Sequence, residues 1–307
     1  MNMSVSSLST HGLRPEQLER SVAYVAENLS RFVKLNEHVL ICFGRGEGQV
    51  LGSIFEQAVL RVGGIPLFWS SDQLWKSLLR QAFLSRSSVI IGPPLVVLGL
   101  AKLVKATGTP LNIRHVVTAG YPCLDWVIEG IIKGLDCSTW GCFGSETGAF
   151  VGGFSCGHSR GVHLRSDAYG LEIVDENDQI ITDGRSGRIR VRDLSEPDQV
   201  WQFPDQGRVE LGACQCGSNI PRLVDILPHS RFPEDVQELG QTLHSWTSIL
   251  DCRVTKGPYG LEMELVVFPG EKLPKLPTCA KRIIRPWDPD RDVPFSLENP
   301  VDLSESH

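Results

Sequence analysis

Apolar positions along the first half of the chain recur at two spacings. Between Leu18 and Phe32 they return every three or four residues, with Pro15 close to the start, which predicts an amphipathic helix. After it, short apolar runs typical of buried strands alternate with further helical patterns. The expected strands are 38–43, 65–69, 88–91 and 114–118, and the expected helices are 49–62, one opened by 70–72, 93–105 and 124–133. This alternation predicts a mostly parallel sheet with helices on its faces.

The pattern changes near residue 150, where polar and apolar residues alternate as in half-buried antiparallel strands. The segments 171–174 and 188–191 show this alternation. From about residue 228, a helical pattern at 233–243 precedes two strand patterns at 251–255 and 262–268. The sequence therefore predicts a mixed α/β fold with a mostly parallel sheet, a β-rich subdomain and a small C-terminal α+β domain. The expected domains are 1–227, with an α/β part at about 13–149 and a β-rich part at about 150–227, and 228–307.

Composition and charge exclude several classes of function. The chain has 307 residues and a net charge of -6, and it lacks the basic stretch that binding to a phosphate backbone requires, so nucleic acid is not an expected partner. Its longest apolar run, 89–101, is interrupted by Pro93 and Pro94, which argues against a membrane span. The N-terminus lacks a signal-peptide pattern. Nine cysteines, an odd number, favour a reducing compartment, so we expect a cytoplasmic protein.

Two short segments carry candidate metal ligands. The first holds Cys156, His158 and His163, and the second holds Cys214 and Cys216 directly before a glycine. Three thiolates and one imidazole are a ligand set that holds tetrahedral zinc, and Cys156 and His163 can complete a closed site with the Cys-X-Cys pair. A closed site would be structural. The alternative is a set of unrelated reduced cysteines, with both histidines on the surface.

The surroundings of the first segment resemble a known enzyme family. In the phenylacetate-CoA ligase branch of the adenylate-forming (AMP-binding, acyl-CoA synthetase) superfamily, a Tyr-Gly-Leu-Ser-Glu motif is followed ten residues later by a cysteine and then by Gly-Leu-His. Here Ser145-Glu146 is followed ten residues later by Cys156, and then by a Gly-Val-His segment that ends at His163.

The second segment agrees with the same family. The family's Thr-Gly-Asp is followed nine residues later by Cys-Pro-Cys-Gly and then by Pro-Arg-Ile. Here Asp205 is followed nine residues later by Cys214-Gln-Cys216-Gly, and then by a Pro-Arg-Leu segment. The likeness covers most of the chain from about Leu13 onward. The family's adenine-side Gly-Ala-Glu-Pro element resembles the run Thr118, Ala119, Gly120, Tyr121 and Pro122.

The resemblance implies a ligase that activates carboxylates. Such enzymes join a small aryl or acyl carboxylate to AMP, using ATP, and then pass the acyl group to coenzyme A. Phosphate charge in this chemistry is neutralised by Mg²⁺ and preformed donors. Glu146 would lie beside magnesium, Asp205 would accept hydrogen bonds from the ribose hydroxyls, and residues 118–122 would line the adenine. Without the family spacing, both acids are read as solvated loop residues.

The resemblance assigns further site residues. The nucleotide motif would also include Phe143, Gly144 and Ser145, although its Tyr-Gly pair is blurred here. The family's late catalytic lysine falls at Cys279, and Lys281 is the nearest substitute. Members of the branch carry zinc on the positions equivalent to Cys156, His163, Cys214 and Cys216.

Several departures from the family pattern bear on activity. The Gly-, Ser- and Thr-rich phosphate loop should precede the helix that starts near Leu13, and the chain begins roughly where that loop would have ended; the segment 44–48 lacks the Gly-Lys-Ser/Thr ending of a substitute. Phe203-Pro204 replaces Thr-Gly before the ribose aspartate, and the interdomain hinge segment is missing within 224–228. Triphosphate binding would lose backbone donors, and the small domain would lose freedom to rotate.

Three hypotheses follow. The retained acids and metal-type ligands favour a shortened acyl-activating enzyme, whose acyl acceptor is coenzyme A, a carrier protein or, in one variant, the thiol of Cys279. The lost phosphate loop and hinge favour a non-catalytic binding or assembly subunit of the same descent. The third hypothesis is one half of a split ligase, in which a second polypeptide supplies the phosphate loop. Phe68, Trp69, Trp75, Trp140 and Phe150 are candidates to line a small acyl pocket, although core packing is the expected role for most of them.

Overall fold

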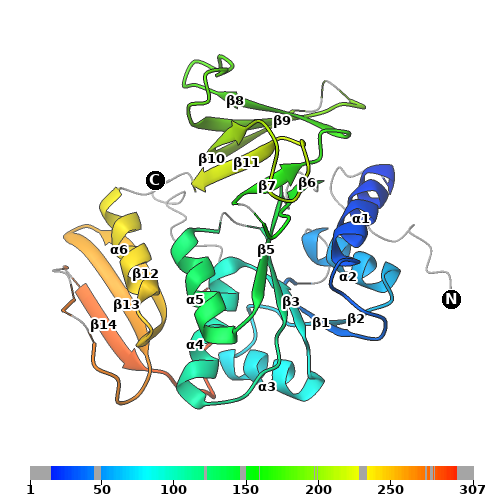
Figure 1. Cartoon of the computed structure of the whole chain (residues 1–307). Helices are drawn as coiled ribbons and strands as arrows, with labels where there is room; N and C mark the ends of the chain where they lie inside the picture. Colours follow the sequence, from blue (N-terminus) through cyan, green and yellow to red (C-terminus); the bar gives the residue numbers. More distant parts are fainter. Residues whose placement is uncertain are drawn as a thin grey trace.

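Parallel strands form the middle of the molecule in the computed structural model (Figure 1). Their spatial order is β2-β1-β3-β4-β5. The strands are β1 (His38–Ile41), β2 (Ile65–Phe68), β3 (Val89–Gly92), β4 (His115–Thr118) and β5 (Ser138–Ser145). The structure describes residues 15–44, 50–120, 123–145, 150–158, 160–196, 198, 200–227, 234–273, 275–276, 279 and 281–295.

Helices cover both faces of the parallel strands, as the sequence predicts. Val39, Ile41 and Val117 point into the core under α1 and α2, whereas Leu40 and Val116 point into the core under α3, α4 and α5. Strands buried on both faces need continuous apolar runs, which is why these strands lack polar alternation. The helices are α1 (Pro15–Leu29), α2 (Val50–Arg61), α3 (Trp75–Ser85), α4 (Pro94–Thr107) and α5 (Asp125–Leu135).

The start of α3 corrects the sequence expectation of a helix opened by residues 70–72. Gln73 N instead donates to Ser70 O in a turn, and the helix begins at Trp75. Trp69 and Trp75 are fully or almost fully buried, which confirms their expected place in the core. No helix in the described ranges has the length and apolar composition needed to cross a bilayer.

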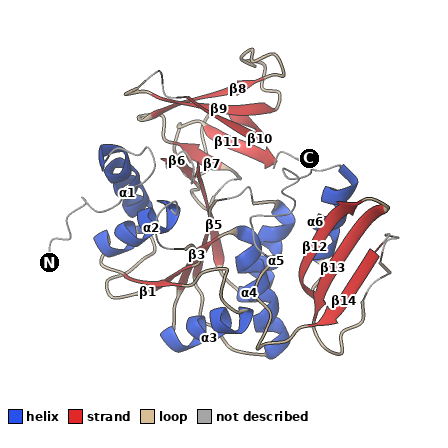
Figure 2. Ribbon diagram, turned by 180° about the vertical axis from the view of Figure 1, so that it is seen from behind, coloured by secondary structure: helices blue, strands red, loops and turns tan. Residues whose placement is uncertain are grey.

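Strand β5 joins the parallel strands to an antiparallel, β-rich part (Figure 2). Gly141 pairs in parallel with Thr118, whereas the next residue, Cys142, pairs in antiparallel fashion with Phe154. The sequence predicted the hairpin of β8 and β9 but not the other strands of this part, whose polar alternation is irregular. The strand order continues β6 (Phe150–Phe154), β7 (Val162–Leu164), β11 (Arg222–Leu227), β10 (Val200–Glu210), β9 (Gly187–Asp193) and β8 (Tyr169–Val174).

A C-terminal unit lies beside α4 and α5 in both views (Figures 1 and 2). Its helix and first two strands match the sequence prediction, and its third strand was not predicted. One face of its sheet packs against its own helix, with Leu243 and Ile249 in that core. The unit consists of α6 (Glu234–Ser245), β12 (Ile249–Gly257), β13 (Gly260–Val267) and β14 (Lys281–Pro286), in the sheet order β12-β13-β14.

A buried carboxylate ties α1 to the β-rich part. Asp193 is fully buried at the end of β9, and its carboxylate accepts hydrogen bonds from the Ser195 main chain at 2.8 Å and from Gln17 at 3.4 Å. Arg20 of α1 forms an ion pair with the same carboxylate at 3.3 Å. Burial acts to raise the pKa of Asp193, but the hydrogen bonds and the charge of Arg20 outweigh it and lower that pKa.

We therefore expect Asp193→Asn to lower the free energy of unfolding at neutral pH by about 2 kcal/mol. Because the folded-state pKa is depressed, this contribution is present above about pH 4 and is lost as the pH falls through the folded pKa. Urea unfolding of both proteins between pH 7 and pH 3 measures it. The difference between them should shrink on acidification, and the exposed Asp72→Asn should show no such difference; a gap independent of pH would contradict the assignment.

Candidate functional site

The carboxyl ends of β1, β3 and β4 meet at one edge of the sheet. The chain runs from β1 outward to β2 and then back across β1 to β3, so the direction of winding reverses between β1 and β3. Ligands of open α/β sheets bind at such a switch point, outside the carboxyl ends of the strands. The segment that begins at Thr118 leaves β4 at this edge, so the sequence-predicted adenine wall stands at the expected place for a ligand.

The first two residues of this wall are buried and bonded within the protein. Thr118 is 3% exposed, and its hydroxyl donates to Trp140 O at 3.2 Å. Ala119 is 1% exposed, and its amide donates to Gly92 O at 3.1 Å. The Thr118 hydroxyl and the Ala119 amide are therefore bonded within the protein. Tyr121 and Pro122, which complete the predicted wall, lie outside the described residues.

Gly120 stands at a close approach between this wall and the segment after β1. Its φ is +87°, and a Cβ built at this position would lie 3.2 Å from the Phe43 ring. A left-handed backbone next to an aromatic ring suits glycine alone. The wall and the segment after β1 thus share one packed surface.

The two nucleotide motifs, far apart in sequence, come together beyond the end of β4. The ring centroids of Phe143 on β5 and Phe203 on β10 are 5.4 Å apart. Phe143 is 8% exposed and belongs to the core of the β-rich part, so its ring is occupied by that core. Gly144 and Ser145 follow it on β5, and Glu146 lies outside the described residues.

Asp205 lies two residues beyond Phe203, in an irregular stretch of β10. The pairing of β10 with β9 shifts between Gln202 and Gln206, so extra residues bulge from the ladder there. Bulges redirect side chains and are common beside functional sites. Asp205 is half-buried. The contact between Phe143 and Phe203 therefore brings the chain just before Ser145-Glu146 close to the chain just before Asp205.

Lys281 stands apart from this edge. It begins β14, the outer strand of the C-terminal sheet, and its ammonium group lies 3.8 Å from Glu262 on β13. Both views show β12 and β13 between β14 and the large sheet (Figures 1 and 2). Cys279, just before it, is half-buried at the rim of the C-terminal core. The structure thus does not bring Lys281 to the Thr118 segment.

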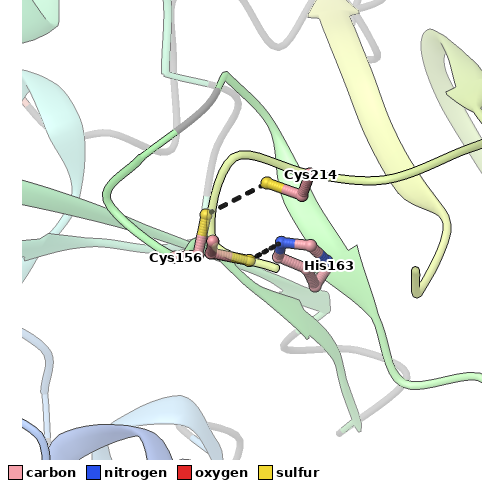
Figure 3. Close-up of side chains that lie close together, drawn as sticks. Cys156, His163 and Cys214 are labelled. Carbon is pink, nitrogen blue, oxygen red and sulfur yellow. Dashed lines mark hydrogen bonds between the residues drawn. The ribbon is translucent and has the colours of Figure 1, made fainter. Parts of the chain in front are cut away.

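The four predicted metal ligands form a cluster, the only group of three or more such side chains that the described part of the chain gathers. Their ligand atoms all lie within 4.8 Å of one another. Figure 3 shows Cys156, Cys214 and His163 turned toward one another from two segments. The Sγ atoms of Cys156 and Cys214 are 3.7 Å apart, and Cys216 Sγ is 3.3 Å from His163 Nε2. His158, the other candidate imidazole, is exposed and outside the cluster.

The Cys156–Cys214 and Cys216–His163 separations are close to those around a tetrahedral ion. Metal bonds of about 2.3 Å to sulfur and 2.1 Å to nitrogen put two sulfurs about 3.8 Å apart, and a sulfur and a nitrogen about 3.6 Å apart. His163 Nδ1 lies 3.2 Å from Ile220 O, and since a carbonyl oxygen only accepts, Nδ1 carries the proton. The Nε2 lone pair is then left facing the thiols, which is the orientation that a metal ligand requires.

A tight turn brings the cysteine pair to one point. Cys214 N donates to Ser218 O at 2.8 Å, and Gly217, with a φ of +86°, donates to Cys214 O at 2.9 Å. A backbone hydrogen bond at Ser218 acts to lower the pKa of the exposed Cys216, but partial desolvation and the neighbouring thiols of Cys214 and Cys156 outweigh it and raise that pKa. A cation among the thiols would reverse this effect, because it stabilises thiolates.

Comparison with solved structures shows the fold. The chain superposes on 2-hydroxyisobutyryl-CoA ligase in the postadenylation state, in complex with 2-HIB-AMP, with a TM-score of 0.68 at 14% identity over 85% of this chain and 60% of that one. With a benzoate CoA ligase from Burkholderia xenovorans LB400 the TM-score is 0.57 at 13% identity, over 87% of this chain and 62% of that one. The chain therefore has the fold of adenylate-forming acyl-CoA ligases and spans about three fifths of their length. No protein-family model and no curated protein sequence matches it.

Structures of the same enzyme in different states give different TM-scores. With 2-hydroxyisobutyryl-CoA ligase in the thioesterification state, the TM-score is 0.58 at 15% identity, over 81% of this chain and 58% of that one. The chain thus agrees better with the postadenylation state of the same enzyme.

The close contact at Gly120 predicts an unequal effect of two alanine substitutions. Gly120→Ala should lower the free energy of unfolding by about 1 kcal/mol more than Gly108→Ala. Both glycines have positive φ and share the backbone cost, but a Cβ at Gly108 meets nothing within 4 Å. Urea unfolding of the two variants measures the difference, and equal losses would show that the Phe43 contact is not tight.

Proposed function

We propose that the chain holds an acyl adenylate, made from ATP and a small aryl or acyl carboxylate, at the carboxyl edge of its parallel strands, as a protein resembling phenylacetate-CoA ligase. The contact between Phe143 and Phe203 is the main support, because it draws the two nucleotide motifs together at that edge. In this proposal Glu146 lies beside Mg²⁺, Asp205 accepts hydrogen bonds from the ribose hydroxyls, and the main chain of Thr118 to Gly120 lies against the adenine. Coenzyme A is the proposed acyl acceptor.

A structural zinc ion on Cys156, His163, Cys214 and Cys216 is part of the proposal. The spacing of the four ligand atoms supports it, as does the orientation of the His163 ring. All four coordination positions would be filled by protein, so the ion would hold the loop after β6 and the loop after β10 together and would not activate water. All nine cysteines are free thiols, which suits a reducing, cytoplasmic setting.

The main alternative is a binding or assembly subunit without catalysis, or one half of a split ligase. The occupied side chains of Thr118 and Phe143 favour it, because both are committed to internal packing. The exposed position of Lys281 on an outer strand favours it too. A carrier protein or a second polypeptide would then supply what this chain lacks for turnover.

Metal analysis tests the zinc proposal. Purified protein should contain about one zinc per chain, and Cys214→Ser or Cys216→Ser should remove most of it, since three ligands hold the ion far less tightly than four. Cys137→Ser, a half-buried thiol outside the cluster, is the matched control and should keep the metal. Undiminished zinc in the Cys214→Ser and Cys216→Ser variants would refute the assignment.

Calorimetry of MgATP and MgAMP binding tests the nucleotide proposal. Asp205→Ala should raise the Kd by about tenfold or more, the usual cost of removing hydrogen bonds to a charged group. Asp183→Ala removes an exposed acid of the same β-rich part and should leave the Kd unchanged. Pyrophosphate release over a panel of aryl and acyl carboxylates then separates the enzyme from the alternative. Absence of nucleotide binding by the wild-type chain would overturn the proposal.

A further inference from the structure

The C-terminal unit packs directly into the core formed by α3, α4 and α5. Leu250 of β12, Val266 of β13 and Phe268 are each at most 4% exposed and share one buried cluster with Leu100 and Leu103 of α4. Domains that move relative to each other usually meet through smaller and more polar surfaces. This interface is continuous with the protein interior.

Lys102 crosses this interface from the middle of α4. Its ammonium group donates to His244 O at 2.6 Å and to Ile249 O at 2.8 Å. The last carbonyls of a helix lack partners within it and carry partial negative charge, so the lysine caps the C-terminus of α6. Lys102 is 5% exposed. Burial lowers its pKa to about 8, although Cys252 and Asp251 on β12 act to raise it.

A second tie comes from residues 287–295, which we call the strap. Asp292 O accepts a hydrogen bond at 3.0 Å from the amide of Trp75, the first residue of α3 and otherwise an orphan donor of that helix. Further along, Phe295 N donates to Asp251 Oδ2 at 2.8 Å. The Asp292 carboxylate, which is almost fully buried, orders the strap by accepting from Asp288 N at 2.6 Å and from Arg285.

We propose that Lys102 and the strap fix the C-terminal unit to the α/β part as one body, in the arrangement of the postadenylation state, so that it does not alternate between arrangements. The better agreement with that state of 2-hydroxyisobutyryl-CoA ligase supports this. The two ties attach to different helices, α4 and α3, and to opposite ends of the unit's chain.

Resting on the proposed function, the fixed arrangement has a chemical consequence. An acyl adenylate held here is consumed by a separate acyl-transfer reaction, in which another molecule presents coenzyme A, the proposed acceptor, so that its thiol reaches the acyl carbon. The new bond to sulfur forms as the bond from the acyl carbon to the phosphate oxygen breaks. AMP leaves with the electron pair, and the nucleophile loses its proton to solvent.

Single-molecule energy transfer on the full chain tests the fixed arrangement. Fluorophores are placed through unnatural amino acids at Lys133 of α5 and at Tyr259 in the β12–β13 turn, both exposed. The wild type should show one distance population, unchanged by MgATP. Lys102→Met and Asp292→Ala should each add a second population, whereas Lys105→Met, on the exposed side of the same helix, should not. Two populations in the wild type, or a shift with MgATP, would overturn the proposal.

Hydrogen exchange of the wild-type chain gives a readout that does not depend on the variants folding. The amide of Trp75, which bonds across the interface to Asp292 O, should exchange within about tenfold of the rate of the β3 amides. Exchange more than about a hundredfold faster would show that the unit detaches on its own and would overturn the proposal. A single distance population without nucleotide binding would refute the proposed function alone, and binding with a changing distance would refute the fixed arrangement alone.

Discussion

The arrangement of this molecule depends on the double pairing of β5. Its first half completes the parallel strands beside β4, and its second half begins the antiparallel ladder with β6. A strand that continues through both kinds of pairing fixes the β-rich part above the carboxyl ends of the parallel strands. This is why Phe143, two residues into the antiparallel half, can reach Phe203. The β-rich part, which follows the parallel strands in sequence, thus lies over the edge where a ligand is expected.

The cysteine and histidine cluster links two segments of the same β-rich part. It joins β7 and the segment before it to the loop between β10 and β11, and the neighbouring strands carry or border both nucleotide motifs. The irregular pairing of β10 makes its position less well determined by the ladder alone. An ion in the cluster would compensate for that irregularity by linking the two segments next to the proposed nucleotide edge.

Two buried charged groups, Lys102 and Asp251, lie at the interface of the C-terminal unit. Burying Lys102 and Asp251 opposes folding, as the lowered pKa of about 8 for the lysine and the raised pKa of about 7 for the aspartate reflect. Each group is nevertheless engaged: the lysine with carbonyls at the end of α6 and the start of β12, and the aspartate with two main-chain amides. Polar groups satisfied in this way make an apolar interface specific in register. Such an interface belongs to a fixed assembly more than to a hinge.

The sequence by itself determined the alternating strands and helices of the first half, because strands buried on both faces and amphipathic helices leave unmistakable spacings. Residue chemistry, spacing and the family resemblance also predicted which four cysteine and histidine side chains lie together. Only the tertiary structure revealed β5 in its two roles, the irregular β10 and the strap on α3, because their residues carry no periodic signal and are specified by partners distant in the chain. The same is true of the engaged Thr118 hydroxyl and of Lys102: burial and pairing depend on neighbours that only folding brings together.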